Sequence, residues 1–275
     1  MRSREWVVLL ILVMFVAFTG AANSIRPAVK VLFDNAHAET AGNADWTIYG
    51  AYSDFADRLR SVGFIVESHE KSDGLLTYEL LKNYKVLVLP EPNSPFKDAE
   101  VDAILKFIEN GGGVFLIGDH TGSDRNHDGW DSPKIFNVFA PKLGFYFAKK
   151  WVSQAPVAGG RVEGFITRGV YRVGAWGATW LEIKDSKRVK AWIFFKFKKQ
   201  GKKPYVITGT YGKGRFAAIG DSSPFDDGTG APGNHLHDGW QTYDHPQLAE
   251  NVVRWLAGED DPKGNVEKIM NMLSE

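Results

Sequence analysis

The chain has 275 residues, of which 44% are hydrophobic and 13% aromatic, a composition typical of a compact globular protein. Its formal net charge is zero, so no overall electric field attracts it to nucleic acid or to a membrane surface. It contains no Cys, which excludes disulfides, thiolate metal sites, cysteine nucleophiles and lipoprotein attachment.

The first 24 residues have the layout of a secretory leader. Arg2 and Arg4 precede an apolar run over 6–18, and small residues follow at 20–22. The apolar run is shorter than the ~20 residues that span a bilayer, but its extension through Ala22 would make an uncleaved anchor. We therefore expect residues 1–24 to be a signal peptide or a membrane anchor. The protein would then be secreted, or anchored on the outer side of the cytoplasmic membrane through residues 6–22 alone.

Apolar runs alternate with amphipathic stretches through the first half of the chain. The patterns predict strands at 29–34, 64–68, 85–90 and 113–119, and helices at 47–63, 75–84, 97–113 and 132–144. This alternation is typical of βαβ units. It predicts an α/β fold with a mostly parallel sheet and helices on both faces.

The second half of the chain changes character. Strand and turn signals dominate from residue 145 and predict a β-rich insertion at about 145–210. Two β-rich runs between 204 and 221, joined by Tyr-Gly-Lys-Gly, indicate a hairpin, and a helix is expected at 244–258. We expect a single α/β domain over 28–258, followed by a C-terminal tail at 259–275.

Three clusters of polar residues each follow a predicted strand. They begin at Asp34, at Gly118 and at Gly220, and the middle one, 118–132, holds four Asp, one Asn, two His and two Ser. Loops of α/β proteins are polar in any case, which would explain each cluster singly. Ligands of open α/β sheets, however, bind beyond the carboxyl ends of the strands, so we expect a shared pocket there. Its predicted lining is Asp34, His37, Asp119, His120, Asp221 and Asp226.

The residue types in this pocket suit a divalent metal. Asp34, His37, Asp119 and His120 would form a mixed oxygen and nitrogen site, and a metal held there could acidify a bound water for hydrolysis. Either Asp221 or Asp226 would then orient the water or act as a base. The predicted catalytic residues are accordingly Asp119, His120, Asp221 and Asp226. The alternative is that Asp119 and Asp221 only brace loops or cap helices.

The middle cluster also matches the start of a calcium-binding loop. Asp124, Asn126, Asp128 and Gly129 fit the pattern D-x-[DN]-x-[DN]-G, in which alternate oxygens wrap a hard cation. The match ends there, because Ile135 stands where the terminal Glu is needed. A calcium ion at 124–128 and a turn that caps the helix at 132 are both consistent with this stretch.

Aromatic and basic residues offer two further surfaces. Trp46, Trp130 and Trp240 lie within the polar clusters and would serve as platforms for sugar rings or as lids that pack the loops. The stretch 184–203 holds nine Lys or Arg against one Asp. It is interpreted as a solvated edge strand, with a polyanion-binding ridge as the alternative.

The order of these elements, with the motifs "GGGVFLIGDHTG" and "YGKGRFAAIGDSSPF…NVVRWLAG", resembles the class I glutamine amidotransferase-like superfamily. The resemblance covers most of residues 28–258 and is to the non-amidotransferase branches, the DUF4350 and ThuA-like domains. It implies an amidotransferase- or flavodoxin-like fold and the position of the pocket. True amidotransferases carry a Cys nucleophile in a G-x-C-x-G turn. Here that turn reads Gly118-Asp119-His120-Thr121-Gly122, so glutamine hydrolysis by the family mechanism is excluded.

These observations predict an exported divalent-metal-dependent hydrolase. Its substrate would be polar, with a phosphodiester or a glycan polymer favoured because the loops offer acids, His and Trp but no long apolar slot. The alternatives are a non-catalytic carbohydrate- or ligand-binding domain and a component of a membrane export or transport assembly. Nucleic acid is the less favoured partner, and the sequence does not determine the oligomeric state.

Overall fold

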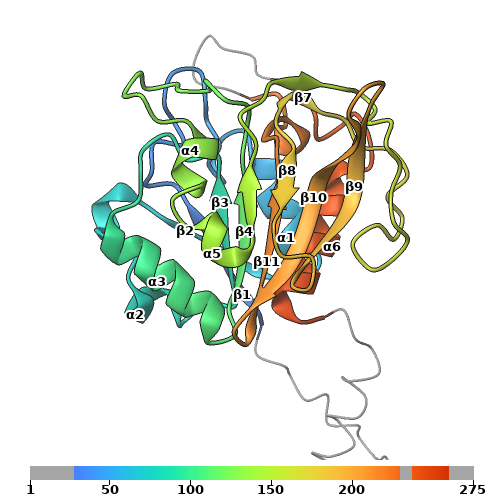
Figure 1. The fold of residues 1–275 in the computed structure, drawn as a ribbon. Helices are drawn as coiled ribbons and strands as arrows, with labels where there is room; N and C mark the ends of the chain where they lie inside the picture. The colour runs from blue at the N-terminus through green and yellow to red at the C-terminus, as the bar shows by residue number, and fades with distance from the viewer. Residues whose placement is uncertain (1–27, 230–236, 260–275) are drawn as a thin grey trace, which may run out of the picture.

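The computed structural model describes residues 28–229 and 237–259, so the predicted leader, His235 and the tail from residue 260 lie outside the described residues. At the centre of the molecule is a seven-stranded sheet with the order β2-β1-β3-β4-β11-β10-β9 (Figure 1). Its strands are β1 (Lys30–Asp34), β2 (Ile65–His69), β3 (Val86–Pro90), β4 (Gly113–Ile117), β9 (Val189–Phe197), β10 (Gly201–Tyr211) and β11 (Gly214–Ile219). The first five strands in this order are parallel. At the edge, β10 runs antiparallel to both of its neighbours, so β9 has the same direction as the first five strands.

Helices cover both faces of this sheet. One face packs against α1 (Ser53–Ser61) and α6 (His245–Ala257), and the other against α2 (Tyr78–Leu81), α3 (Asp98–Glu109), α4 (Ser132–Phe136) and α5 (Ala140–Leu143). The central strands β3 and β4 are buried along their whole length, as their continuous apolar sequences predict. The predicted α/β class is therefore confirmed. Within the described ranges, no helix combines the length and hydropathy that a membrane span requires.

Three predicted helices differ from the structure. The one expected at 75–84 is reduced to the four residues of α2, which begins after its N-cap Thr77. The helix expected at 47–63 begins only at Ser53, because the preceding residues form turns such as the one closed by the Gly50 amide and the Thr47 carbonyl. The helix expected at 132–144 is divided into α4 and α5. The side chain of Asn137 is hydrogen-bonded to the backbone of Phe147 at 2.9 Å in both directions, and Pro141 has no amide to continue the helical ladder.

The region predicted as a β-rich insertion is only partly outside the sheet. Its second part supplies β9 and β10, and β10 forms the predicted hairpin with β11 through a turn in which Gly212 has a positive φ of 58°. Its first part forms two small antiparallel sheets, β5 (Phe145–Phe147) with β8 (Leu181–Ile183), and β6 (Val152–Ser153) with β7 (Trp176–Ala178). Two short 3-10 helices, η1 (Lys71–Asp73) and η2 (Ser223–Phe225), complete the described elements.

Candidate functional site

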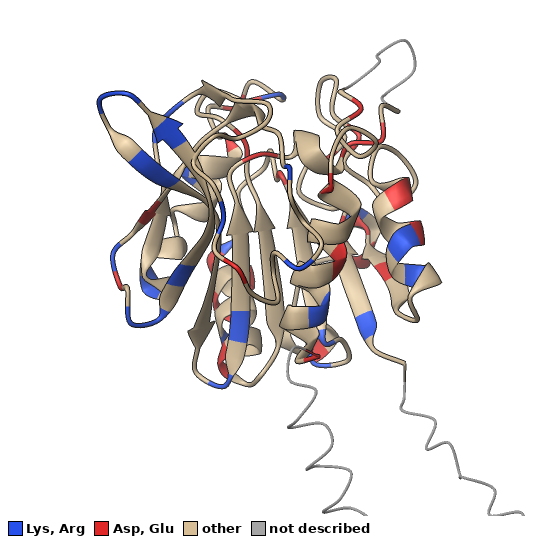
Figure 2. Cartoon of the chain, turned by 90° about the vertical axis from the view of Figure 1, so that its right-hand side faces the viewer, with Lys and Arg blue, Asp and Glu red and all other residues tan. Residues whose placement is uncertain are grey.

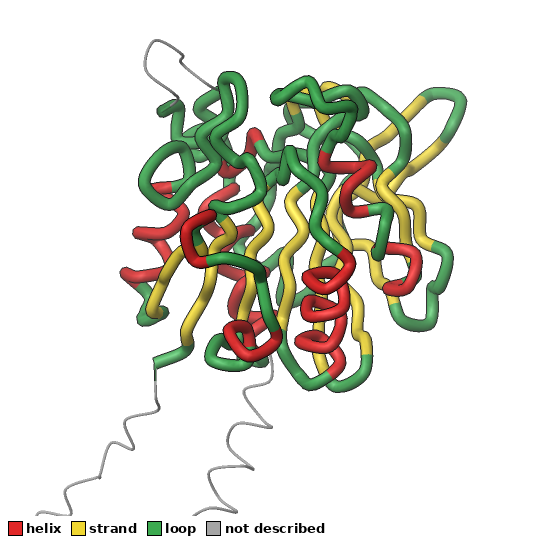
Figure 3. The backbone as a smooth tube through the Cα atoms, turned by 90° about the vertical axis from the view of Figure 1, so that its left-hand side faces the viewer, coloured by secondary structure: helices red, strands yellow, loops and turns green. Residues whose placement is uncertain are grey.

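The polar loops gather at one end of the molecule. Strands β1, β3, β4 and β11 are neighbours and parallel, so the loops that follow them leave the sheet at the same end, which we call the rim (Figure 3). Many acidic and polar side chains of these loops are buried. They are Asp34, His37, Glu39, Glu91, Asn93, Asp119, Asp221 and Asp226. The structure thus places all three predicted clusters at one rim, but it divides their residues into two buried groups.

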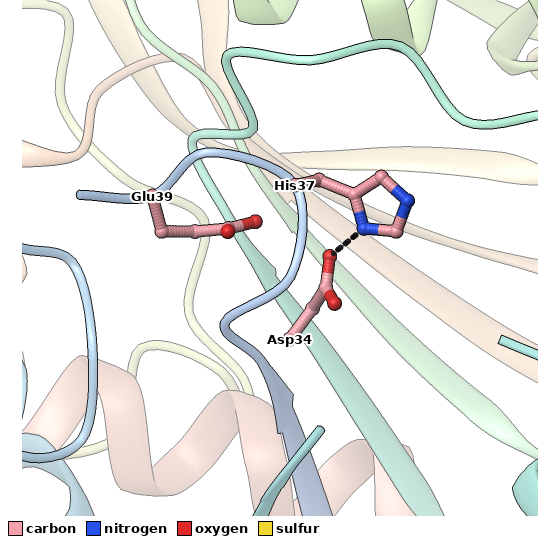
Figure 4. Close-up of side chains that lie close together, drawn as sticks. All are labelled: Asp34, His37 and Glu39. Atoms are coloured by element: carbon pink, nitrogen blue, oxygen red, sulfur yellow. Dashed lines mark hydrogen bonds and ion pairs between the residues drawn. The ribbon is translucent and has the colours of Figure 1, made fainter. Parts of the chain in front are cut away.

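The first group is built around Asp34, the last residue of β1. Its Oδ2 lies 2.6 Å from Nδ1 of His37 (Figure 4). Its Oδ1 lies 3.2 Å from Nδ1 of His69. The other ring nitrogen of His37, Nε2, lies 3.3 Å from Oε2 of Glu100, which projects from α3. The imidazole of His37 is therefore held between two carboxylates.

This arrangement makes Asp34 and His37 an ion pair at neutral pH. Burial alone would lower the pKa of His37, but the charges and hydrogen bonds of Asp34 and Glu100 outweigh it and raise that pKa to about 9. Burial alone would raise the pKa of Asp34, but the neighbouring His37 and His69 lower it to about 2. The pair thus keeps its charges over the whole physiological range.

Glu39 completes the first group and was not among the predicted site residues. Its side chain is fully buried, and neither carboxylate oxygen has a hydrogen-bond partner. Ligand atoms of Asp34, His37 and Glu39 lie within 4.8 Å of one another, the one such grouping of three found in the described part of the chain. Burial and the charge of Asp34 raise the pKa of Glu39 well above its usual range. A carboxyl group in this setting requires either a proton or a cation.

The second group is centred on Arg125, which sequence reasoning also missed. Its Nε lies 2.8 Å from Oε1 of Glu91, and its Nη2 lies 2.8 Å from Oδ2 of Asp119. Its Nη1 donates to Oδ1 of Asn43 at 2.8 Å, and the guanidinium lies 5.3 Å from the ring centroid of Trp46. One side chain therefore ties the loop after β4 to the loops after β1 and β3.

The charges of the second group are incompletely balanced. Burial, together with Glu91 and Asp221, raises the pKa of Asp119 well above its usual range, although Arg125 opposes the shift. Burial would lower the pKa of Arg125, but Glu91 and Asp119 raise it. One guanidinium thus faces two buried carboxyl groups.

Asp221 and Asp226 follow β11 and adjoin this group. Asp221 accepts hydrogen bonds from the amides of Trp176 at 2.6 Å and Ser223 at 3.0 Å, and burial raises its pKa to about 7. Asp226 accepts one from the Gly228 amide at 2.9 Å, while its Oδ2 has no partner, and burial raises its pKa to about 8. Both side chains are buried, so neither would contact a substrate directly.

The backbone amide of His120 donates to Oδ1 of Asp119 at 2.6 Å, but its imidazole faces away from both groups, toward Thr121 and Trp151. Its Nδ1 lies 2.9 Å from the carbonyl oxygen of Thr121, so Nδ1 carries the proton and Nε2 is left as an acceptor. Its ring lies 6.3 Å from the ring of Trp151 and is partly exposed. The four predicted metal ligands are consequently not brought together. Asp34 and His37 are paired, Asp119 is bound by Arg125, and His120 faces Trp151.

The predicted calcium loop is held together by its own hydrogen bonds. The carboxylate of Asp124 accepts from the amides of Asp128 at 3.1 Å and Gly129 at 2.8 Å. Asn126 donates to the carbonyl of Asn93 at 2.6 Å. Asp131 accepts from the Lys134 amide at 2.8 Å and so caps α4. These bonds are typical of a turn that caps α4, and calcium binding at 124–128 stays a prediction.

The three Trp residues singled out in the sequence are packing residues to different degrees. Trp46 and Trp240 are 2% and 6% exposed, and Trp240 stacks on Phe55 with centroids 5.7 Å apart. Trp130 is partly exposed, with Lys134 over its ring at 4.3 Å. Trp151, which the sequence did not single out, is 63% exposed.

Comparisons with known proteins agree on the fold. No family model matches the sequence, and no curated protein does either. Among solved structures, the mmIFT52 N-terminal domain is similar with a TM-score of 0.65 and 17% identity, over 82% of this chain and 97% of that one. A ThuA-like protein from Bacteroides uniformis is similar with a TM-score of 0.53 and 19% identity, over 88% and 96% of the two chains. One from Parabacteroides merdae has a TM-score of 0.53 and 15% identity, over 86% and 92%. Identities this low show the fold alone, and the chain therefore has a ThuA-like α/β fold with extra strands.

Proposed function

We propose that this chain is an exported, divalent-metal-dependent hydrolase of a polar polymer, with its metal held by Asp34, His37 and Glu39. The proposal is carried by the fully buried carboxylate of Glu39, whose oxygens have no partner although Asp34 lies beside it. Two adjacent buried carboxyl groups cannot both be ionised without several kcal/mol of cost. A divalent cation between them would remove that cost.

The donor set favours a metal that accepts both carboxylate and imidazole ligands, such as Zn²⁺, Mn²⁺ or Fe²⁺. When bound, such a metal supplies an acidified water for hydrolysis. His37 would have to release the proton that it shares with Asp34 before it could bind the metal. Since the pKa of His37 is raised to about 9 by Asp34 and Glu100 against the effect of burial, we expect metal affinity to increase with pH up to that value.

The remaining rim residues would handle protons. The Nδ1 of His120 faces the Thr121 carbonyl oxygen, so in the neutral ring Nε2 is the nitrogen that would act as a general base. Burial raises the pKa of Asp221 to about 7 and that of Asp226 to about 8, so both groups exchange protons near neutral pH. These roles support hydrolysis. Export rests on the leader pattern at 1–24, and membership of the DUF4350 branch rests on the sequence motifs alone.

One observation favours a second function. The three metal ligands are between 0% and 7% exposed, which is typical of closed structural metal sites rather than of catalytic sites with an open position. In that case the metal would stiffen the rim, and the chain would be a non-catalytic domain that binds a carbohydrate or another polar ligand. The two functions differ in whether the metal-loaded protein turns over a substrate.

Metal binding is tested by elemental analysis and by titration with Zn²⁺ and Mn²⁺. We expect one ion per chain, and at a free metal concentration of 100 times Kd a stabilisation of about 2.7 kcal/mol. Glu39→Gln should weaken binding at least about tenfold, whereas Glu109→Gln, at the far end of α3, should not alter it. Metal-free protein whose melting temperature is indifferent to EDTA and to both ions would overturn the proposal.

Catalysis is tested separately with nuclease, phosphatase and glycosidase substrates, with and without chelator. We expect chelator-sensitive turnover that His120→Ala lowers by about 10²–10⁴-fold while the melting temperature is unchanged, because this ring is partly exposed. A protein that binds its metal but hydrolyses no substrate in the panel would favour the binding domain. An unchanged rate in the His120 variant would remove His120 from the mechanism.

A further inference from the structure

Seven lysines form a positively charged surface next to the rim, which we call the cationic arm. They are Lys149, Lys150, Lys196, Lys198, Lys199, Lys202 and Lys203. Five of them lie at the tip of the β9–β10 hairpin. Because β10 runs antiparallel to β11, this tip stands at the same end of the molecule as the rim loops (Figure 2). Although the net charge of the chain is zero, basic residues of the hairpin and acidic residues of the rim loops occupy separate surfaces at this end of the protein.

The lysines of the arm lack acidic partners. No ion pair joins any of them to an Asp or Glu within the described ranges, and residues 186–203 contain neither acid. Lysines elsewhere in the chain do form such pairs, for example Lys30 with Glu67 at 2.9 Å and Lys184 with Glu182 at 3.1 Å. Like charges that share a surface without counter-charges leave a positive potential that attracts an anion.

Two of these lysines lie over the ring of Trp180. The ammonium of Lys150 lies 5.2 Å from the centroid of this ring, and that of Lys203 lies 5.7 Å from the same centroid. Phe197 packs against the ring with centroids 5.4 Å apart. Two cations from distant parts of the chain therefore converge on one aromatic side chain, with no carboxylate between them.

The arm is physically continuous with the rim. The carbonyl of Lys150 accepts a hydrogen bond from the amide of Thr121 at 3.0 Å, which joins the arm to the loop after β4. The next residue, Trp151, is 63% exposed and lies beside His120, with ring centroids 6.3 Å apart. A linear ligand could therefore run from His120 over Trp151 to the lysines of the hairpin.

We propose that this track binds single-stranded nucleic acid, with phosphates on the cationic arm and a base stacked on Trp151. The inference rests on the proposed function and names its polymer as a phosphodiester. Lysines alone would suit any polyanion, but lysines interleaved with an exposed aromatic ring are the combination that binds single strands, because every base presents a face for stacking. Binding itself needs no metal, since none of these residues belongs to the Asp34 group.

The test uses the full chain in EDTA with a fluorescein-labelled thymidylate 20-mer and fluorescence anisotropy. Lys198→Glu/Lys199→Glu should weaken binding about tenfold or more and reduce the slope of log K against log salt by up to about 1.4, since each phosphate contact contributes about 0.7. The control is Lys187→Glu/Lys213→Glu. It makes the same charge change near the opposite ends of the same two strands and should leave the affinity within about twofold.

Two further variants distinguish the contribution of stacking from that of charge, and oligonucleotide binding from metal binding. Trp151→Ala should weaken binding at least about fivefold without changing the salt slope, because stacking releases no counterions. Glu39→Gln should bind the oligonucleotide as the unchanged protein does, because Glu39 lies outside the cationic arm. Oligonucleotide binding can therefore be observed even if the metal proposal is wrong. Equal loss in both lysine pairs, or binding of a sulfated polysaccharide with no binding of the oligonucleotide, would overturn the inference.

Discussion

Replacement of Arg125 by Met is expected to lower the free energy of unfolding by about 3–5 kcal/mol. The guanidinium is the positive charge that contacts both Glu91 and Asp119, at 2.8 Å each, and both acids are buried. Removal of one member of a buried charged group leaves the others uncompensated in a medium that solvates charge poorly. Chemical denaturation at pH 7, with an unchanged m-value, measures the loss.

Two further variants test whether uncompensated buried charge is the cause of this loss of stability. Arg60→Met removes a guanidinium whose partner, Asp57, is exposed, so a loss of only about 0–1 kcal/mol is expected. Combining Arg125→Met with Glu91→Gln and Asp119→Asn removes the acids as well, and should recover most of the stability. If Arg125→Met costs no more than Arg60→Met, or if the triple variant is no more stable than the single one, the charge account of this group is wrong.

The free energy of unfolding is expected to fall by several kcal/mol between pH 5 and 9. Burial raises the pKa of Asp221 from 3.8 to about 7 and that of Asp226 from 3.8 to about 8. Each acid therefore favours the folded state below pH 3.8 and loses that contribution as the pH rises through its folded pKa. Opposing the effect of burial, Asp34 and Glu100 raise the pKa of His37 from 6.5 to about 9, so its contribution is present below pH 6.5 and disappears by pH 9.

All three groups act in the same direction, and one pKa unit corresponds to about 1.4 kcal/mol. For a domain of this size each kcal/mol changes the melting temperature by about 2–4 °C, so a decrease of about 10 °C or more is expected between pH 5 and 9. Thermal melts over this range in metal-free buffer measure it. A melting temperature that rises with pH would contradict the assignment of raised pKa values to the buried acids.

Asp226→Asn identifies the source of this pH dependence. Its Oδ1 accepts from the Gly228 amide and its Oδ2 has no partner, so an amide can replace the carboxyl group without breaking a hydrogen bond. The variant should recover about 3 kcal/mol or more of the stability lost by pH 9. Asp102→Asn, an exposed position on α3, should leave the pH profile as it is in the unchanged protein.

Much of the fold could be predicted from local patterns. The runs that became β1, β3 and β4 are continuous and apolar because both of their faces are covered, and the spacing of Val101, Ile104, Leu105 and Ile108 marks the buried side of α3. Such patterns report on burial, which is a property of each segment. The parallel arrangement of these strands then placed their following loops at one rim.

The patterns failed where a distant contact decided the local structure. The helix expected at 132–144 is broken where the side chain of Asn137 bonds to the backbone of Phe147 rather than to its own helix. Likewise, β9 and β10 resemble an independent insertion in sequence, but the pairing of β10 with β11 makes them part of the main sheet. Neither contact has a signal within the segment that it controls.

The candidate site, like the fold, is predicted in part by local patterns and decided in part by distant contacts. The sequence by itself determined that acids and imidazoles follow the parallel strands, because strand direction alone brings those loops to one end. Only the tertiary structure decided which of these side chains meet: Asp34 with His37 and Glu39, and Asp119 with Arg125 instead of His120. The path of each loop and the balance of buried charge determine which side chains at the rim contact one another. Both depend on contacts between segments far apart in the chain, so no local pattern could have specified them.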